Sequence, residues 1–266
     1  MEGHNVAFEN RFAQVEEALV SRVAELIDLK VDVIIVAGNN PTRVASAATS
    51  TIPIVMALSN DPVGTGLVSS LAHPGRNVTG MANLSTELNA KRLELLKDVA
   101  PGVSRVALVW DPTVPGRAGT DVELGVAARA LDLQMVPHPI RGGSLLGALA
   151  AASAGGADAI LLLPDFLTAG LTSNLQGYFG KVRLPTIVES AEYARVGGLV
   201  AYGPSSPALF ERAAVYVDKI LKGARPADLP VEQPTTFDLA INLKTARALG
   251  LTIPPSILQQ ATEVIQ

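Results

Sequence analysis

Polar residues suited to contacting a small molecule follow a series of apolar segments in this 266-residue chain. Each segment is an apolar run that leads into a polar turn: 33–37 into Gly38, Asn39, Asn40, Pro41 and Thr42; 54–58 into Ser59, Asn60, Asp61 and Pro62; 106–110 into Asp111, Pro112 and Thr113; and 160–163 into Pro164 and Asp165. Amides, hydroxyls and carboxylates can hydrogen-bond a solute, and free N–H groups at a helix start suit a carboxylate. The pattern favours binding chemistry.

Motifs for nucleotide binding and for hydrolysis are incomplete. Gly64 and Gly66 begin a G-x-G-x-x-G pattern, but Ser69 stands where the third glycine is needed. Gly142 and Gly147 have the spacing of a phosphate loop, but Ala148 replaces its lysine. The segment 142–146 also lacks the last glycine of G-x-S-x-G. No cofactor is therefore expected.

Composition excludes further classes of chemistry. The chain has no cysteine, which excludes disulfides, thiolate metal sites and cysteine nucleophiles. Its histidines lack the paired spacing of a metal site: His4, His73 and His138. The net charge of −4 argues against a nucleic-acid partner. No apolar run approaches the roughly 20 residues that span a bilayer.

Carboxylates and aromatic residues near the strand ends admit two interpretations. Asp61, Asp111 and Asp165 could transfer protons, but acidic residues at strand ends more often cap helices or contact ligands. Glu189 and Asp165 could accept hydrogen bonds from an ammonium group or hydroxyls. Four aromatic residues near strand ends could stack on a ligand or could pack in the core: Trp110, Phe166, Tyr193 and Tyr202.

Hydrophobic periodicity predicts an α/β fold with parallel sheets covered by helices on both faces. Strands are predicted at 5–9, 31–37, 51–58, 77–81, 105–110, 134–138, 158–163, 185–188, 199–202 and 231–241. Helices are predicted between them, including a long one with Phe12 and Leu19 on its apolar face, and others at 64–71, 86–99, 117–131, 144–153, 168–180, 190–195 and 209–222. Asn40 is expected to be an N-cap, with Pro41 as the first helical residue. Two short helices are expected near 243–249 and 255–263.

Several longer segments carry a family resemblance. They are VDVIIVAG at 31–38, ATSTIPIV at 48–55, DPV at 61–63, GLVSSLAHPGRNVTG at 66–80, KRLELL at 91–96, PADLPVEQP at 226–234 and INLKTA at 241–246. With these segments the chain resembles the periplasmic substrate-binding proteins of bacterial ABC transporters, in the group related to tryptophan- and phenylalanine-binding components. The resemblance spans almost the whole chain.

The resemblance implies a type I periplasmic-binding fold, with two doubly wound parallel-sheet lobes that close on a solute by hinge motion. By analogy, lobe 1 is expected at 1–82 and 204–228, and lobe 2 at 83–203 and 229–266. The expected ligand is a small polar organic solute, such as an aromatic amino acid or a carboxylate, in the cleft between the lobes. The expected partners are an ABC permease and its ATPase, and no nucleic acid or membrane span is expected. Family members are periplasmic and are not enzymes.

Specific residues are expected to hold this solute. Helix N-termini at 40–42, 59–61 and 111–113 would hold an acid group, and Asp165 and Glu189 would hold an amine or hydroxyl. The complete predicted set is Asn39, Asn40, Thr42, Ser59, Asn60, Asp61, Trp110, Asp111, Thr113, Asp165, Glu189 and Tyr202. No residue is expected to be catalytic or to bind a metal.

The start of the chain departs from the family pattern. Members begin with an export signal and a first strand–helix unit, and this chain is expected to start after that unit. We therefore expect a truncated form, which would stay in the cytoplasm if this start is the real one. Two other functions remain open: a ligand-sensing domain of a regulator, and an α/β enzyme that acts on an acidic metabolite.

Overall fold

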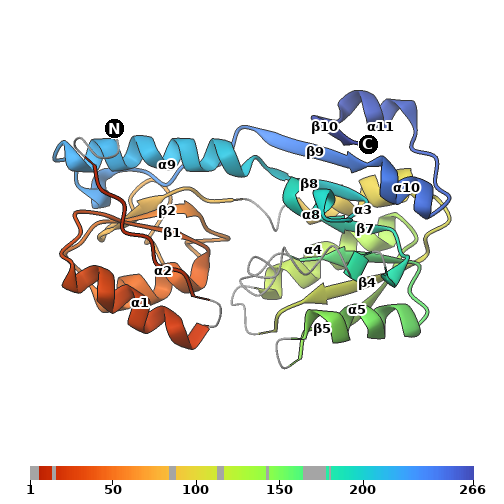
Figure 1. The fold of residues 1–266 in the computed structure, drawn as a ribbon, viewed down its shortest axis with the longest axis horizontal. Helices are drawn as coiled ribbons and strands as arrows, with labels where there is room; N and C mark the ends of the chain where they lie inside the picture. The colour runs from red at the N-terminus through yellow and green to blue at the C-terminus, as the bar shows by residue number, and fades with distance from the viewer. Residues whose placement is uncertain are drawn as a thin grey trace. The chain divides into compact units, whose positions relative to one another are not determined.

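The computed structural model describes residues 6–13, 16–83, 88–112, 117–141, 144–163, 178–179 and 181–266. The chain divides into two compact units, Met1–Ala82 with Leu209–Gln233 (unit 1) and Asn83–Ala208 with Pro234–Gln266 (unit 2). It therefore passes from one unit to the other after Ala82, Ala208 and Gln233. Each unit contains its own sheet (Figure 1).

Unit 1 is a three-stranded parallel sheet with helices on both faces (Figure 1). Its order is β1 (Ile34–Ala37), β2 (Ile54–Leu58) and β3 (Val78–Gly80). The helices are α1 (Glu16–Asp28), α2 (Asn39–Ala48), α9 (Ser206–Leu221) and the 3₁₀ helix η1 (Pro226–Asp228).

Successive residues of β2 face opposite sides of this sheet, as the strand period of two requires. Ile54 and Met56 pack in the apolar cluster that contains Val23 of α1 and Ala45 of α2. Val55 and Ala57 pack instead in the cluster formed with Leu209, Ala213 and Tyr216 of α9. The continuous apolar sequence of β2 thus reflects burial on both faces.

Unit 2 contains a seven-stranded sheet with the order β10-β9-β8-β7-β6-β4-β5. The strands are β4 (Arg105–Trp110), β5 (Gln134–Pro139), β6 (Ala159–Leu162), β7 (Thr186–Val188), β8 (Val200–Pro204), β9 (Phe237–Asn242) and β10 (Glu263–Ile265). The helices are α3 (Asn89–Val99), α4 (Arg117–Ala130), α5 (Leu145–Ala154), α8 (Ala191–Arg195), α10 (Leu243–Ala248) and α11 (Pro255–Gln260).

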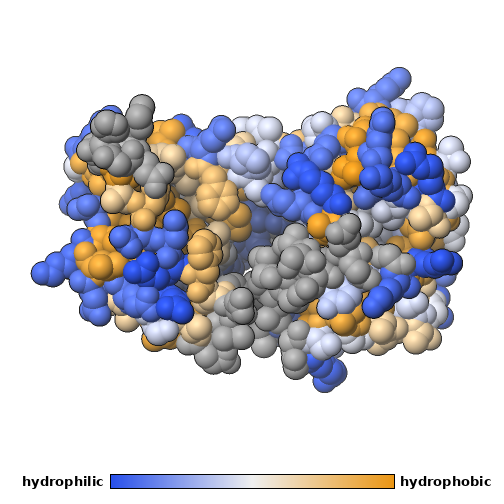
Figure 2. Space-filling view, viewed as in Figure 1, coloured by the Kyte–Doolittle hydropathy of each residue, from blue (hydrophilic) through white to orange (hydrophobic). Residues whose placement is uncertain are grey.

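Helices cover both faces of this sheet as well. One apolar cluster joins Val106 and Leu108 of β4 to α3, α4, α10 and α11, and another joins Ala107 and Val109 to α5 and α8. The surface over α8 is hydrophilic in Figure 2. There Arg195 pairs with Glu263 of the edge strand β10 at 2.6 Å. The predicted α/β class is confirmed.

The order in which successive strands join the sheet reverses at β4. β5 lies on one side of β4 and β6 lies on the other, and both pair with it in parallel. The connections that leave β4 and β6 therefore diverge at their carboxyl ends, which is where open α/β sheets bind ligands. Asp111 follows β4 directly at this point.

Three local predictions in unit 1 are wrong. The strand predicted at 5–9 does not form, because residues 7–9 have no regular secondary structure. No helix forms at 64–71, where the backbone makes turns. The Asp61 carboxylate accepts a hydrogen bond from the Gly64 N–H at 2.8 Å, and Gly66 adopts a φ of 73°, which ends any helical path. Asn40 is also not an N-cap, because Gly38 occupies that position with a φ of 97° and α2 begins at Asn39.

Both ends of the chain also differ from the predicted pattern. The first described helix begins at Glu16, and Phe12 lies before it with 84% of its surface exposed. Near the other end, the predicted strand 231–241 is shorter, since β9 spans Phe237–Asn242 and runs antiparallel to β8. The predicted last helix ends at Gln260, and β10 follows it. The predicted helix 168–180 lies almost entirely outside the described residues.

The stability of unit 2 is expected to fall on mild acidification because of His138 in β5. The His138 Nε2 atom is buried and has no hydrogen-bond partner among the described residues. Burial lowers the pKa of His138 from its usual value of 6.5. The unfolded chain therefore binds this proton more readily, so stability is present above about pH 6.5 and is lost as pH falls below it. The loss is at most about 1.4 kcal/mol per pH unit, and less for a partly buried ring.

Thermal unfolding between pH 7.5 and pH 5 tests this expectation. His138→Gln should show a shallower decline of the melting temperature with falling pH than the unmodified protein. His73→Gln, at an exposed histidine, should retain the original slope. Equal slopes for all three proteins would remove His138 as the cause.

Candidate functional site

The turns after β1 and β2 are joined by the side chain of Asn39. Its Nδ2 donates to the Asn60 carbonyl oxygen at 2.7 Å, and its Oδ1 accepts from the Ser59 hydroxyl at 2.7 Å and from the Asn60 N–H at 2.9 Å. Parallel strands place both turns at one edge of the sheet, so a single amide can bridge them. These hydrogen bonds give Asn39 a structural role at this edge.

Removing this bridge is expected to destabilise unit 1. Asn39→Ala leaves the fully buried Ser59 hydroxyl and the Asn60 backbone groups without these partners, which costs about 2–3 kcal/mol. Asn39→Asp retains the acceptor for Ser59 but places a carboxylate oxygen against the Asn60 carbonyl oxygen, so it should also destabilise unit 1. Urea unfolding of the three proteins measures the difference. An Asn39→Ala variant as stable as the unmodified protein would contradict the bridging role.

The first turn of α2 lies at the same edge. Thr42 is fully buried, and its hydroxyl donates to the Gly38 carbonyl oxygen at 2.7 Å. Asn40 is 8% exposed. Gly38 provides no side chain to cap the helix. Since the first N–H groups of a helix have no partner within it, the start of α2 favours an anionic group.

Asn60 and Asp61 complete this edge. The Asn60 Oδ1 atom is buried and has no hydrogen-bond partner among the described residues. Asp61 is exposed, with a φ of 40°, and its carboxylate stabilises its own turn. Because no helix follows 59–61, this segment is not the helix N-terminus that the sequence predicted.

Glu189 follows β7 at the carboxyl edge of the sheet in unit 2. Its Oε1 accepts a hydrogen bond from the Asn83 Nδ2 at 3.0 Å, and its Oε2 lies 3.7 Å from the Arg92 Nη2. Its side chain remains 14% exposed. The carboxylate is therefore fixed in position on a side chain that remains partly exposed.

Arg92 of α3 is fully buried beside this carboxylate. Its Nε donates to the Tyr202 carbonyl oxygen at 2.7 Å, and its Nη1 donates to the Asn89 Oδ1 at 2.6 Å. Burial lowers the pKa of the Arg92 guanidinium, and the charge of Glu189 opposes that effect. A buried cation of this kind requires a counter-charge, which Glu189 supplies.

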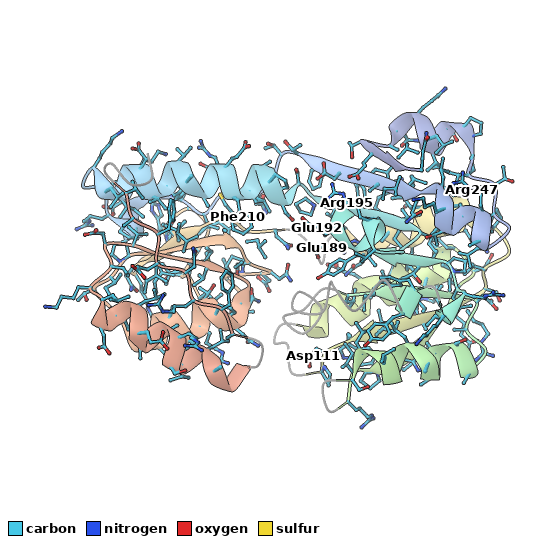
Figure 3. The ribbon with its side chains drawn as sticks, in the orientation of Figure 1. Asp111, Glu189, Glu192, Arg195, Phe210 and Arg247 are labelled. Atoms are coloured by element: carbon cyan, nitrogen blue, oxygen red, sulfur yellow. The ribbon has the colours of Figure 1, made fainter. Side chains whose placement is uncertain are left out.

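Asp111 and Glu189 lie at the same edge of the unit 2 sheet, after β4 and β7, as Figure 3 shows. Asp111 is 7% exposed. Trp110 and Tyr202 are partly buried against the apolar cluster around Leu108, and Tyr202 stacks on Phe237 with 6.3 Å between the ring centroids. Packing therefore occupies at least part of each aromatic ring.

The predicted site residues thus fall into two groups. The structure brings Asn39, Asn40, Thr42, Ser59, Asn60 and Asp61 together in unit 1, and Trp110, Asp111, Glu189 and Tyr202 at the edge of the sheet in unit 2. Thr113 and Asp165 lie outside the described residues.

Three residues at this edge were not predicted from the sequence: Arg92, Asn83 and Asn89. Asn89, Arg92, Leu96 and Val99 follow the helical spacing i, i+3, i+7 and i+10, and all four are buried. A charged residue within an apolar helical stripe was therefore the signal that could have identified Arg92.

Within the described ranges, no group of three or more His, Asp or Glu side chains could hold a metal ion. Among the helices in the same ranges, none is both long enough and apolar enough to cross a bilayer.

Comparison with known proteins identifies the family. The family model described as ABC transporter substrate binding protein matches residues 1–265. A curated relative, the tyrosine-binding protein of Clostridioides difficile strain R20291, is 25% identical over 253 residues, which cover 94% of this chain and 72% of the relative.

Solved structures support the same assignment. A conserved domain protein from Vibrio cholerae is 28% identical, with a TM-score of 0.89 over 99% of this chain and 88% of that one. A Streptococcus pneumoniae ABC domain in complex with L-Trp is 25% identical, with a TM-score of 0.82 over 94% of this chain and 86% of that one. The fold is of the type I periplasmic-binding-protein kind, and the chain belongs to the ABC transporter substrate-binding protein family.

Proposed function

We propose that this protein captures an aromatic amino acid or a closely related small carboxylate for an ABC importer, outside the cytoplasmic membrane. The observation that carries the proposal is the Glu189 carboxylate, which Asn83 and Arg92 hold at the carboxyl edge of the sheet with 14% of its side chain exposed. A fixed carboxylate on a partly exposed side chain suits the ammonium group of an amino acid.

Unit 1, taken by itself, also carries a group that suits a carboxylate. The start of α2 has no side-chain cap, so its free N–H groups favour a carboxylate. The named ligands of two relatives, tyrosine and L-Trp, are amino acids with aromatic side chains. Together these points favour a zwitterionic aromatic solute.

Calorimetry with purified protein tests the ligand class. We expect saturable heat with at least one of L-tryptophan, L-tyrosine and L-phenylalanine, and none with sugars or polyamines. A ligand at 100 times its Kd should stabilise the protein by about 2.7 kcal/mol, which thermal unfolding detects. Absence of heat and of any thermal shift with all three amino acids would overturn the aromatic ligand class.

Uptake measurements test the transport role. Deletion of the gene in its native host should reduce the uptake of the radiolabelled ligand that calorimetry identifies, and expression of the full-length protein should restore it. Binding in vitro without any change in uptake would separate ligand capture from import. The permease and ATPase partners would then be excluded for that solute.

A further inference from the structure

A buried guanidinium is the most unusual charged group in unit 2. Arg92 has no exposed surface, although arginine is almost never fully buried unless it is paired. Three of its nitrogen atoms point to three different groups: the Tyr202 carbonyl oxygen, the Asn89 amide oxygen and the Glu189 carboxylate. The rigid planar fork of arginine can meet all three at once, whereas the single ammonium of lysine cannot.

These three contacts lie on different elements of the fold. Asn89 is in the first turn of α3, Tyr202 is in β8, and Glu189 follows β7. Val188 of β7 pairs with Ala201 of β8, so Glu189 and Tyr202 are at the same level of the sheet. Arg92 therefore connects α3 to the ends of two neighbouring parallel strands.

The backbone near Glu189 is constrained as well. Gly203 of β8 approaches Glu189 so closely that an added Cβ would lie 2.3 Å from the Glu189 carbonyl oxygen. The Glu189 side chain is held on one oxygen by Asn83 and faces Arg92 with the other. The carboxylate consequently has little freedom to rotate.

From this geometry we infer that Arg92 is a positioning residue, which fixes the Glu189 carboxylate in the orientation that receives the ammonium group of the solute. The inference rests on the proposed function, because it requires a solute with an ammonium group. It differs from a purely structural role of Arg92 in one measurable respect. Arg92 should affect the preference for a ligand with an ammonium group over the same ligand without one.

The first experiment uses no ligand. Thermal unfolding is measured for Arg92→Met, Glu189→Gln and the double variant. Each single variant leaves one partner in place without its counter-charge, so each should melt lower than the unmodified protein. The double variant removes both charges and should melt higher than the sum of the two single shifts predicts. Additive shifts would overturn the inference, whichever solutes bind.

The second experiment compares L-tryptophan with indolepropionate, and L-tyrosine with its desamino analogue. In the unmodified protein the amino acid should bind more tightly than the analogue. Arg92→Met should reduce that preference about tenfold or more, the loss expected of a misplaced charge-assisted hydrogen bond. Arg92→Lys, which retains the charge without the fork, should recover only part of it. Lys91→Met, at an exposed position on the same helix, should leave it unchanged.

The outcomes separate this inference from the proposed function. Equal weakening of the amino acid and its analogue by Arg92→Met indicates a structural role alone and overturns the inference, while amino-acid binding by the unmodified protein still supports the function. If no amino acid binds the unmodified protein, both the proposed function and the positioning role are overturned. Circular dichroism of each variant establishes that it is folded before titration.

Discussion

Glu189→Gln is expected to weaken the binding of an aromatic amino acid about 100-fold, because two effects act together. The ammonium group of the solute loses a charge-assisted hydrogen bond. The buried Arg92 guanidinium loses its counter-charge as well, while its hydrogen bonds to Tyr202 and Asn89 remain, so an uncompensated cation stays beside the position of the ammonium group and repels it. Calorimetric titration of the folded variant measures the effect.

Two variants control this result. Glu192→Gln changes a nearby exposed carboxylate on α8, which lies close to Glu189 in Figure 3, and it should change the affinity less than about twofold. Glu189→Asp keeps the charge on a shorter side chain and should give an intermediate loss. Unchanged affinity in Glu189→Gln would remove Glu189 from the site and leave the Arg92 pair as a feature of stability alone.

Gly80→Ala is expected to destabilise unit 1 by about 3–5 kcal/mol, the largest stability effect that the structure predicts. Gly80 ends β3 with a φ of 132°, which L side chains rarely adopt. An added Cβ would lie 2.2 Å from the Met56 carbonyl oxygen and 2.6 Å from the Met56 nitrogen in β2. These are backbone atoms of the paired strand, so the clash cannot be relieved by rotating a side chain.

Gly66→Ala is the matched control in the same unit. Gly66 also has a positive φ, 73°, but a Cβ there would meet nothing within 4 Å. Gly66→Ala should therefore destabilise unit 1 by only about 1–2 kcal/mol, which is the cost of the left-handed backbone conformation for an alanine. Urea unfolding with hydrogen exchange in β2 and β3 compares the two variants. Equal destabilisation would show that the close approach of β2 and β3 carries no cost.

The elements that were predicted well from the sequence are those with a clear local pattern of apolar residues. Strands β1, β2, β4 and β6 are short, β-branched or aliphatic runs bounded by turn residues, and this pattern is local. The helix predicted at 64–71 failed because its apolar residues Leu67 and Val68 are buried in a turn. Hydrophobic spacing reports burial, and a compact turn can bury the same residues as a helix.

The site was predicted in part. Positions at the ends of parallel strands were visible in the sequence, because an apolar run followed by a polar turn marks a carboxyl edge. The role of each side chain there was not visible. Asn39 contacts Ser59 and Asn60, which lie 20 and 21 residues after it in the sequence, and the Ser59 hydroxyl donates to it. Only the pairing of β1 with β2 creates this contact.

The sequence by itself determined the α/β class, the family and the strand ends that carry polar groups, because these depend on local periodicity and on segments read along the chain. The tertiary structure alone decided which charges meet. Arg92 and Glu189 are 97 residues apart, and their Nη2 and Oε2 atoms lie 3.7 Å from each other because α3 packs against β7 and β8. Ion pairing depends on distance in space, and no pattern along the chain contains that distance.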